Sequence, residues 1–267
     1  MSRTSPLMNV MQLAARKVSR RLVRDFGEVE NLQVSRKGPG DFVTAADVRT
    51  DEKLRDALQQ ARPNFGFLTE EGKDIVGQDE TRRWIIDPID GTMNFMHGTP
   101  VFSISIALEE AGEVTAGLVY APVSDEMFWA EKGQGAYLND RRLRVATRRH
   151  MGDTVIGTGM PHMGSPDTTG YLAELGAVMA ECGGIRCLGA ASLDLAYVAA
   201  GRFDGFWDTG LAPWDIAAGL LLAREAGATV SRTDGGGNPL YAGDVLVANE
   251  AIHSRMLRLI RHSRRAE

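Results

Sequence analysis

Cysteine is scarce in this chain of 267 residues, which contains only Cys182 and Cys187. Their spacing matches no zinc motif and no second pair is present, so we expect two reduced thiols and no disulfide framework. Reduced thiols are typical of the cytoplasm. The chain also lacks a secretory signal and any apolar run near the roughly 20 residues that span a bilayer. These absences predict a cytoplasmic protein with no membrane segment.

Net positive charge is absent as well. The 30 lysines and arginines are outnumbered by 35 aspartates and glutamates, which leaves a formal net charge of −5. General binding to nucleic acid requires a net basic face, so we expect no nucleic-acid partner. The sequence contains no Gly-x-Ser-x-Gly elbow and no phosphate-binding loop followed by Lys-Ser/Thr. The five histidines form no pair at metal-ligand spacing, so a histidine-based metal site is not expected either.

Hydrophobic periodicity predicts a mixed α and β protein. Apolar residues recur at helical spacing over 6–26, and alternating β-branched and aromatic residues over 101–147 predict a run of strands. Beyond about residue 150, helical and strand patterns are interleaved. Because no linker or low-complexity block separates these regions, we expect an N-terminal half, residues 1–148, and a C-terminal half, residues 149–267, packed as one compact unit.

Two aspartates, Asp87 and Asp90, directly follow the apolar run 84–86. The proline between them biases the first aspartate toward an extended conformation, Gly91 permits a tight bend, and Thr92 is able to cap a following helix. A strand end, a turn and a helix cap explain this pattern without any chemistry. Carboxylates placed against a buried strand nevertheless cost free energy unless something pairs with them.

Further acids occupy similar positions elsewhere. Glu70 and Glu71 follow a second apolar stretch, and Asp215 lies at a predicted helix start. A solvated loop acid and a helix cap are the simpler interpretations of these residues. If Glu70, Asp87, Asp90 and Asp215 converge, four like charges require neutralisation, which two divalent cations supply. Oxygen ligands without histidine or cysteine favour Mg²⁺ or Mn²⁺ over Zn²⁺.

These residues lie within motifs that together resemble the inositol monophosphatase family of Mg²⁺-dependent, lithium-sensitive phosphatases. The matching segments are 41–47 (DFVTAAD), 69–72 (TEEG), 84–95 (WIIDPIDGTMNF), 188–192 (LGAAS) and 214–227 (WDIAAGLLLAREAG). The segment 201–207 (GRFDGFW) resembles bacterial members. The resemblance spans the chain and implies a layered α-β-α-β-α architecture, a homodimer and a phosphomonoesterase activity.

The resemblance also implies the metal ligands. Glu70, Asp87 and the Ile89 carbonyl would hold a first Mg²⁺ ion, and Asp87, Asp90 and Asp215 would hold a second. A third, weaker ion would depend on Glu70 through water, so two or three ions are expected per site, with Mn²⁺ as a substitute.

Catalytic groups follow from the same resemblance. Gly91 and Thr92 would offer backbone N–H groups to the phosphate at a helix N-terminus, where unpaired donors favour an anion. Asp47 would accept the Thr92 hydroxyl hydrogen, and Thr92 with Glu70 would orient and deprotonate the attacking water. Thr44 and Asp47 also match a capping box, which explains Asp47 without any catalytic role.

Three positions would face the polyol: Asp90, the Ala191 backbone and Asp208. The family usually has glutamate in place of Asp208, and Ala190 stands where Ser or Thr is common, so both departures weigh against strict inositol specificity. The segment 92–98 (TMNFMHG) resembles the inositol branch. The sequence therefore predicts hydrolysis of inositol 1-phosphate or a related small polyol phosphate.

Two alternatives stay open. One is a phosphatase for another small ester: fructose 1,6-bisphosphate, histidinol phosphate or a 3′-phosphonucleotide. The other is a regulatory or scaffolding protein that works through contacts of its basic C-terminal helix. The arginines concerned are Arg255, Arg258, Arg261, Arg264 and Arg265. A solvated helix face is the simpler explanation of those arginines.

Overall fold

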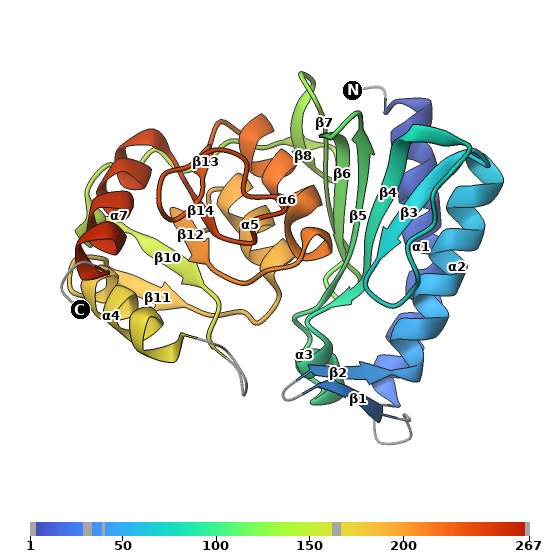
Figure 1. Cartoon of the computed structure of the whole chain (residues 1–267), viewed down its shortest axis with the longest axis horizontal. Helices are drawn as coiled ribbons and strands as arrows, with labels where there is room; N and C mark the ends of the chain where they lie inside the picture. The colour runs from blue at the N-terminus through green and yellow to red at the C-terminus, as the bar shows by residue number, and fades with distance from the viewer. Residues whose placement is uncertain (1–3, 29–33, 39–40, 162–166, 265–267) are drawn as a thin grey trace.

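The computed structural model describes residues 4–28, 34–38, 41–161 and 167–264. Helices and sheets alternate in five layers, α-β-α-β-α (Figure 1). The helices of the three helical layers, in that order, are α1 (Pro6–Gly27) and α2 (Ala45–Ala61), α5 (Ala191–Ala199) and α6 (Pro213–Glu225), and α4 (Thr168–Met179) and α7 (Glu250–Ser263). This arrangement confirms the predicted fold class. Within the described residues, no helix has both the length and the apolar character needed to cross a membrane.

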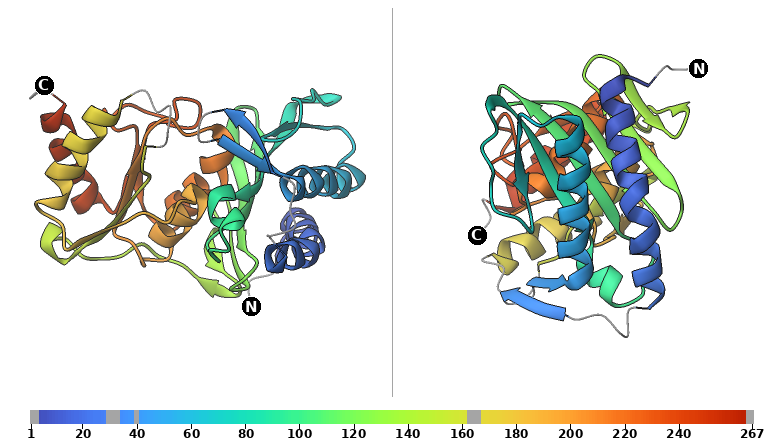
Figure 2. Two further views of the ribbon diagram at one scale, coloured as in Figure 1. Left: turned by 90° about the horizontal axis from the view of Figure 1, so that it is seen from below. Right: turned by 90° about the vertical axis from the view of Figure 1, so that its right-hand side faces the viewer.

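The first sheet has seven strands in the order β3-β4-β5-β6-β7-β8-β9. Only the β3–β4 pair is parallel. The strands are β3 (Phe65–Thr69), β4 (Asp79–Asp90), β5 (Ser103–Glu110), β6 (Glu113–Ala121), β7 (Glu126–Glu131), β8 (Gly135–Leu138) and β9 (Arg141–Arg142). Figure 2 shows α1 and α2 side by side across one face of this sheet. A two-stranded ribbon, β1 (Val34–Gly38) and β2 (Asp41–Thr44), leads into α2.

The second sheet has five strands in the order β11-β10-β12-β14-β13. The strands are β10 (Val155–Thr158), β11 (Gly184–Arg186), β12 (Gly205–Asp208), β13 (Thr229–Ser231) and β14 (Val245–Ala248). Because β10 runs parallel to β12, with Thr158 opposite Trp207, their carboxyl ends lie at the same edge. Ligands of α/β sheets characteristically bind beyond this edge.

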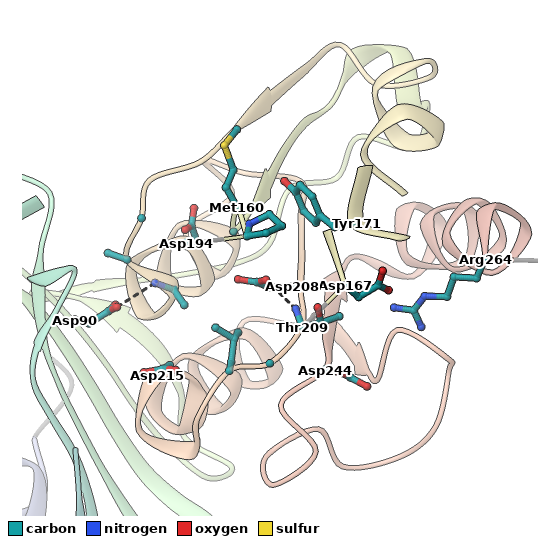
Figure 3. A pocket seen from close by; sticks show the side chains of 17 residues that line it. Asp90, Met160, Asp167, Tyr171, Asp194, Asp208, Thr209, Asp215, Asp244 and Arg264 are labelled. Atoms are coloured by element: carbon teal, nitrogen blue, oxygen red, sulfur yellow. Dashed lines mark hydrogen bonds between the residues drawn. The ribbon is translucent and has the colours of Figure 1, made fainter. Parts of the chain in front are cut away.

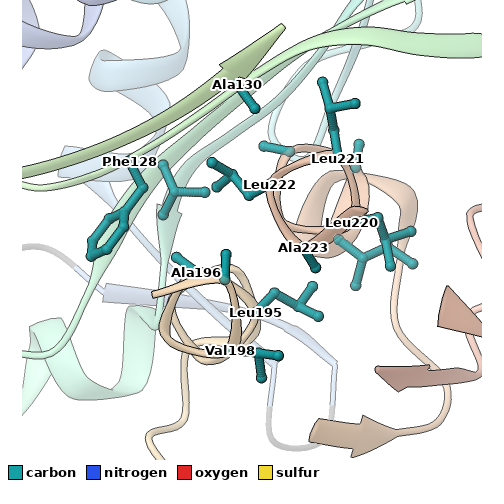
Figure 4. Close-up of a cluster of buried hydrophobic side chains, with 14 of the residues drawn as sticks. Phe128, Ala130, Leu195, Ala196, Val198, Leu220, Leu221, Leu222 and Ala223 are labelled. Carbon is teal, nitrogen blue, oxygen red and sulfur yellow. The ribbon is translucent and has the colours of Figure 1, made fainter. Parts of the chain in front are cut away.

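Helices α5 and α6 form the central layer and share one apolar core with both sheets (Figure 4). A side chain at Gly117 of β6 would place its Cβ 3.0 Å from the backbone of Ala218, so a glycine lets α6 approach this strand closely. Side chains alternate along β4: Ile85 belongs to this central core, whereas Ile86 belongs to the core beneath α1 and α2. The predicted division of the chain at residues 148 and 149 stays a prediction.

Candidate active site

An irregularity in β4 determines where its two aspartates point. Asp87 pairs with Ser105 and Asp90 with Ser103, so three steps along β4 match two steps along β5. A regular strand would direct residues three apart to opposite faces, whereas one extra residue restores the same face. Ile89 shows the same change of face, because it packs in the core beneath α1 and α2, unlike Ile85. The bulge therefore turns both carboxylates toward the central helices.

Asp90 caps the start of α5 from a distant part of the chain. Residue Ala190 at the N-cap has no side-chain acceptor, and the first N–H groups of a helix have no intrahelical partner. The Asp90 carboxylate accepts from Ala191 N at 3.2 Å, Ser192 N at 2.8 Å and Ser192 Oγ at 2.5 Å. Ser192 Oγ also lies 2.7 Å from Ser103 Oγ. The reasoning from sequence missed Ser192, because no local pattern links it to an acid about a hundred residues earlier.

The other three predicted acidic ligands lie within electrostatic reach of one another and of Asp90. Asp87 is 2% exposed, and its Oδ1 accepts from Ile89 N at 2.9 Å. Glu70 follows β3, and its backbone N donates to Ile86 O at 3.1 Å, which holds it beside the end of β4. Asp215 lies in the first turn of α6, where its Oδ2 accepts from Ala212 N at 2.7 Å. Asp215 is therefore not the N-cap residue, which is Ala212, although its carboxylate accepts the N–H of that residue from the third position of the helix.

The four acids repel one another. Burial first, and then the charges of Glu70, Asp90 and Asp215, raise the pKa of Asp87 well above its usual range. Burial, followed by the charge of Asp90, raises the pKa of Asp215 to about 8. Burial also raises the pKa of Asp90, although hydrogen bonds from Ser192 oppose the effect. The structure thus brings the four acids within electrostatic reach.

The four acids suit a divalent metal ion, because all are hard oxygen donors whose mutual repulsion such an ion would relieve. The Asp90 carboxylate lines the cavity, and a carboxylate has acceptor sites beyond those that its helix-cap hydrogen bonds use. In the part of the chain that the structure describes, however, no three acidic, thiol or imidazole groups already form a converged metal-binding cluster. Bound ions would therefore have to draw the carboxylates together.

Thr92 and Asp47 make the predicted contact. Thr92 Oγ1 lies 3.1 Å from Asp47 Oδ1 and 3.0 Å from the Ile89 carbonyl oxygen. Asp47 is fully buried, and its other oxygen accepts from Thr44 N and from Thr44 Oγ1, which completes a capping box at the start of α2. Burial raises the pKa of Asp47 against these hydrogen bonds. The two interpretations of Asp47 are therefore compatible, because each uses a different oxygen.

Thr92 does not cap the helix that follows it, so that expectation was wrong. Helix α3 (Thr92–Met96) begins at Thr92 itself, and Gly91 occupies the N-cap with a φ of 94° and no side-chain cap. A Cβ at Gly91 would lie 3.0 Å from the Val101 carbonyl oxygen, so both conformation and space require glycine. Asn94 Nδ2 donates to Val101 O and Leu188 O, both at 2.7 Å, and joins α3 to the segment before α5.

A cavity of about 690 Å³ opens beside the acids (Figure 3). All three predicted polyol-facing residues line it, as does Asp215, whereas Gly91 and Thr92 do not. Ala191 N already donates to Asp90, and Asp208 Oδ1 accepts from Thr209 N at 2.8 Å. The acids along its wall are Asp90, Asp167, Asp194, Asp208, Asp215 and Asp244, accompanied by one arginine, Arg264. Such a wall favours the hydroxyl-rich part of a ligand over its phosphate.

Comparison with known proteins identifies the family of this chain. Residues 4–265 match the model of the inositol monophosphatase family. The inositol-1-monophosphatase of Mesorhizobium japonicum is 56% identical, with 96% of this chain and 97% of that protein covered. The solved suhB protein of Bartonella henselae is 52% identical, covers 96% of this chain and 99% of its own, and superposes with a TM-score of 0.94. The Nus factor SuhB of Escherichia coli K12 is 40% identical, with 94% of each chain covered. The chain therefore belongs to the inositol monophosphatase family and is a phosphatase of that family.

Proposed function

We propose that this phosphatase hydrolyses inositol 1-phosphate or a related small polyol phosphate, with Mg²⁺ held by the four acids and the Ile89 carbonyl. The observation that carries the proposal is the electrostatic proximity of Glu70, Asp87, Asp90 and Asp215: burial, and then the charges of the other three acids, raise the pKa of Asp87. Acids so placed require protons or cations, and oxygen donors of this kind prefer Mg²⁺ or Mn²⁺. The family is generally metal-dependent, which agrees with this assignment.

The chain's own groups orient the reaction. Divalent cations at such a site neutralise phosphoryl oxygens and lower the pKa of a water molecule. The Thr92 hydroxyl has one hydrogen and two neighbouring acceptors, Ile89 O and Asp47 Oδ1. If the Ile89 carbonyl oxygen binds a cation, Asp47 is the remaining acceptor for the Thr92 hydroxyl hydrogen. The Thr92 oxygen is then able to accept a hydrogen bond from the attacking water. Glu70 is the acceptor for the proton of that water.

The two ends of the substrate have different partners. The phosphate lies at the start of α3, where the Gly91 and Thr92 N–H groups are available as donors because a helix start lacks intrahelical acceptors. The polyol extends into the cavity toward Asp90, Ala191 and Asp208. Since Ala191 N donates to Asp90 at 3.2 Å, its contact with a substrate oxygen requires a shared hydrogen bond.

A substrate panel tests this proposal. Phosphate release is measured at equal concentrations of inositol 1-phosphate, fructose 1,6-bisphosphate, histidinol phosphate and 3′-phosphoadenosine 5′-phosphate, with Mg²⁺, Mn²⁺ or EDTA. We expect Mg²⁺-dependent release that is strongest on the inositol ester and is abolished by Asp87→Asn. A preference for another ester would retain the metal site and change the substrate. Release that persists in EDTA would refute the metal assignment.

The resemblance also motivates three further proposals. The protein is proposed to form a homodimer, to be inhibited by lithium and to function in the cytoplasm. Light scattering during size-exclusion chromatography measures the first, and a lithium titration at fixed Mg²⁺ measures the second. Fractionation of cells followed by immunodetection measures the third. A monomer, an unaffected rate or a membrane-bound pool would contradict the corresponding proposal.

A regulatory role is the second candidate, because one relative is named a Nus factor. The C-terminal helix offers less free positive charge than its sequence suggests. Arg255 pairs with Glu181 at 2.7 Å, Arg264 pairs with Glu174 at 2.5 Å, and Arg261 donates to a backbone oxygen. Arg265 lies outside the described residues. A strain lacking this protein distinguishes the two roles: rescue by a folded variant without turnover would favour regulation.

A further inference from the structure

A buried acid, Asp194, lies on the wall of the cavity. It is 1% exposed, and no hydrogen-bond donor within the described residues reaches its Oδ1. Figure 3 places Asp194 and Asp208 on the side of the cavity nearer Asp90, with Asp244 and Arg264 farther away. A buried polar group without a partner costs free energy, so its presence calls for an explanation.

Helix capping does not explain Asp194. Asp194 is the fourth residue of α5, one position beyond the acid of a capping box, and a capping acid uses the unpaired N–H groups at the helix start. In α5 these groups are already engaged, because Ala191 N and Ser192 N donate to Asp90. Asp194 therefore lies on the cavity wall without a capping role.

Two glycines at the end of β10 make room for the neighbouring carboxylates. A Cβ at Gly157 would lie 3.2 Å from Asp194 Oδ1, and a Cβ at Gly159 would lie 1.9 Å from Asp208 Oδ2. The glycines of the Gly157-Thr158-Gly159 segment do not have the spacing of a dinucleotide-binding motif. The close approach of the two carboxylates explains instead why glycine occupies these positions. The two carboxylates are therefore seated side by side against bare backbone, at the edge where β10 and β12 end.

We propose that Asp194 is a specificity residue that hydrogen-bonds a hydroxyl group of the polyol, next to the contacts of Asp90 and Asp208. This inference rests on the proposed function and adds a residue to its polyol subsite. A phosphate has no donor hydrogens at neutral pH and would be repelled by Asp90 and Asp208, whereas a hydroxyl both donates and accepts. Burial, and then the charges of Asp90 and Asp208, raise the pKa of Asp194, so the group can hold a proton and match a hydroxyl in both roles.

Matched substrates separate polyol recognition from chemistry. Inositol 1-phosphate and cyclohexyl phosphate have the same ring size, and only the first has ring hydroxyls beyond the ester. We expect Asp194→Ala to lower kcat/KM about tenfold for the inositol ester, the effect of one hydrogen bond, and to leave cyclohexyl phosphate unchanged. Asp194→Asn, which retains one donor and one acceptor, should restore most of the loss. Asp244→Ala is the control, since it removes another acid from the same cavity.

The thermal unfolding temperature distinguishes recognition from a structural role. Removal of an unpartnered buried acid should not lower it. Equal losses of kcat/KM on both esters, or no loss on either, would overturn the inference about Asp194. The proposed function would still stand if the wild type shows Mg²⁺-dependent hydrolysis. A wild type that hydrolyses neither ester would refute the proposed function and this inference with it.

A second variant decides the question if Asp194→Ala does not fold. The Cβ of Gly157→Ala would be 3.2 Å from Asp194 Oδ1 and 2.9 Å from a Phe203 ring carbon, so the carboxylate must move by a few tenths of an ångström. We expect a severalfold loss on the inositol ester alone. An unchanged ratio of the two kcat/KM values would overturn the inference.

Discussion

Replacing Asp215 by asparagine should stabilise the protein in the absence of metal ions. The same substitution should abolish most of the activity measured with Mg²⁺. The folded carboxyl ionises at about 8, compared with an ordinary pKa of 3.8. Its folded pKa is raised, so between these values the folded state binds more protons than the unfolded chain. The stability of the metal-free protein must therefore fall as the pH rises from about 4 to 8. Asparagine has no charge and retains an oxygen that can accept from Ala212 N.

The size of the gain follows from the same values. Each tenfold change in proton affinity corresponds to about 1.4 kcal/mol. The gain in the free energy of unfolding therefore has an upper limit of about 4 kcal/mol at pH 7. The coupled acids share protons and relax, so we expect a gain of at least about 1 kcal/mol, equivalent to roughly 2–4 °C in Tm for a chain of this size. Turnover should fall by orders of magnitude, because the second ion would lose a charged ligand.

The assay is thermal unfolding in EDTA and in saturating Mg²⁺, at pH 5 and at pH 8, together with phosphate release. In EDTA the difference in Tm between variant and wild type should be larger at pH 8 than at pH 5. Mg²⁺ should raise the Tm of the wild type by more than that of the variant. Asp244→Asn controls for loss of an acid from the same cavity. A variant that melts below the wild type in EDTA at pH 8, or that retains near-normal turnover in Mg²⁺, would refute the reasoning.

Three further predictions concern the groups beside the acids. Thr92→Val should lower kcat about a hundredfold, whereas Thr92→Ser keeps the hydroxyl and most of the rate in steady-state assays; similar rates for both would contradict the role of the hydroxyl. Thr44→Val should cost about 1 kcal/mol of stability with little change in kcat, and Asp47→Asn should lower kcat at least about tenfold; wild-type kinetics for the latter would leave Asp47 only its capping role. Gly91→Ala should lower Tm in EDTA by more than Gly98→Ala, because both have positive φ but only Gly91 is crowded by a backbone oxygen at 3.0 Å. Equal melting temperatures would show that the crowding is relieved without cost.

Local sequence determined the elements that carry the site. Short apolar runs predicted strands before Glu70 and Asp87, because such runs are typical of buried strands, although β4 extends beyond its run in both directions, from Asp79 to Asp90. The Thr44 and Asp47 pair predicted the start of α2, because a capping box involves residues only three apart. The motifs also identified the family, since they preserve both residue type and spacing.

Tertiary structure alone decided how these residues combine. The β4 bulge places Asp87 and Asp90 on one face, and no periodicity in the sequence reveals the extra residue, because it is defined by register against β5. Asp90 caps α5 through Ala191 and Ser192, more than a hundred residues away, so no local pattern could have found this contact. Because that contact engages the N–H groups at the start of α5, it also leaves Asp194 on the cavity wall without a capping role. Local propensity therefore specified the pieces, whereas strand register and long-range packing assembled the acids into one site.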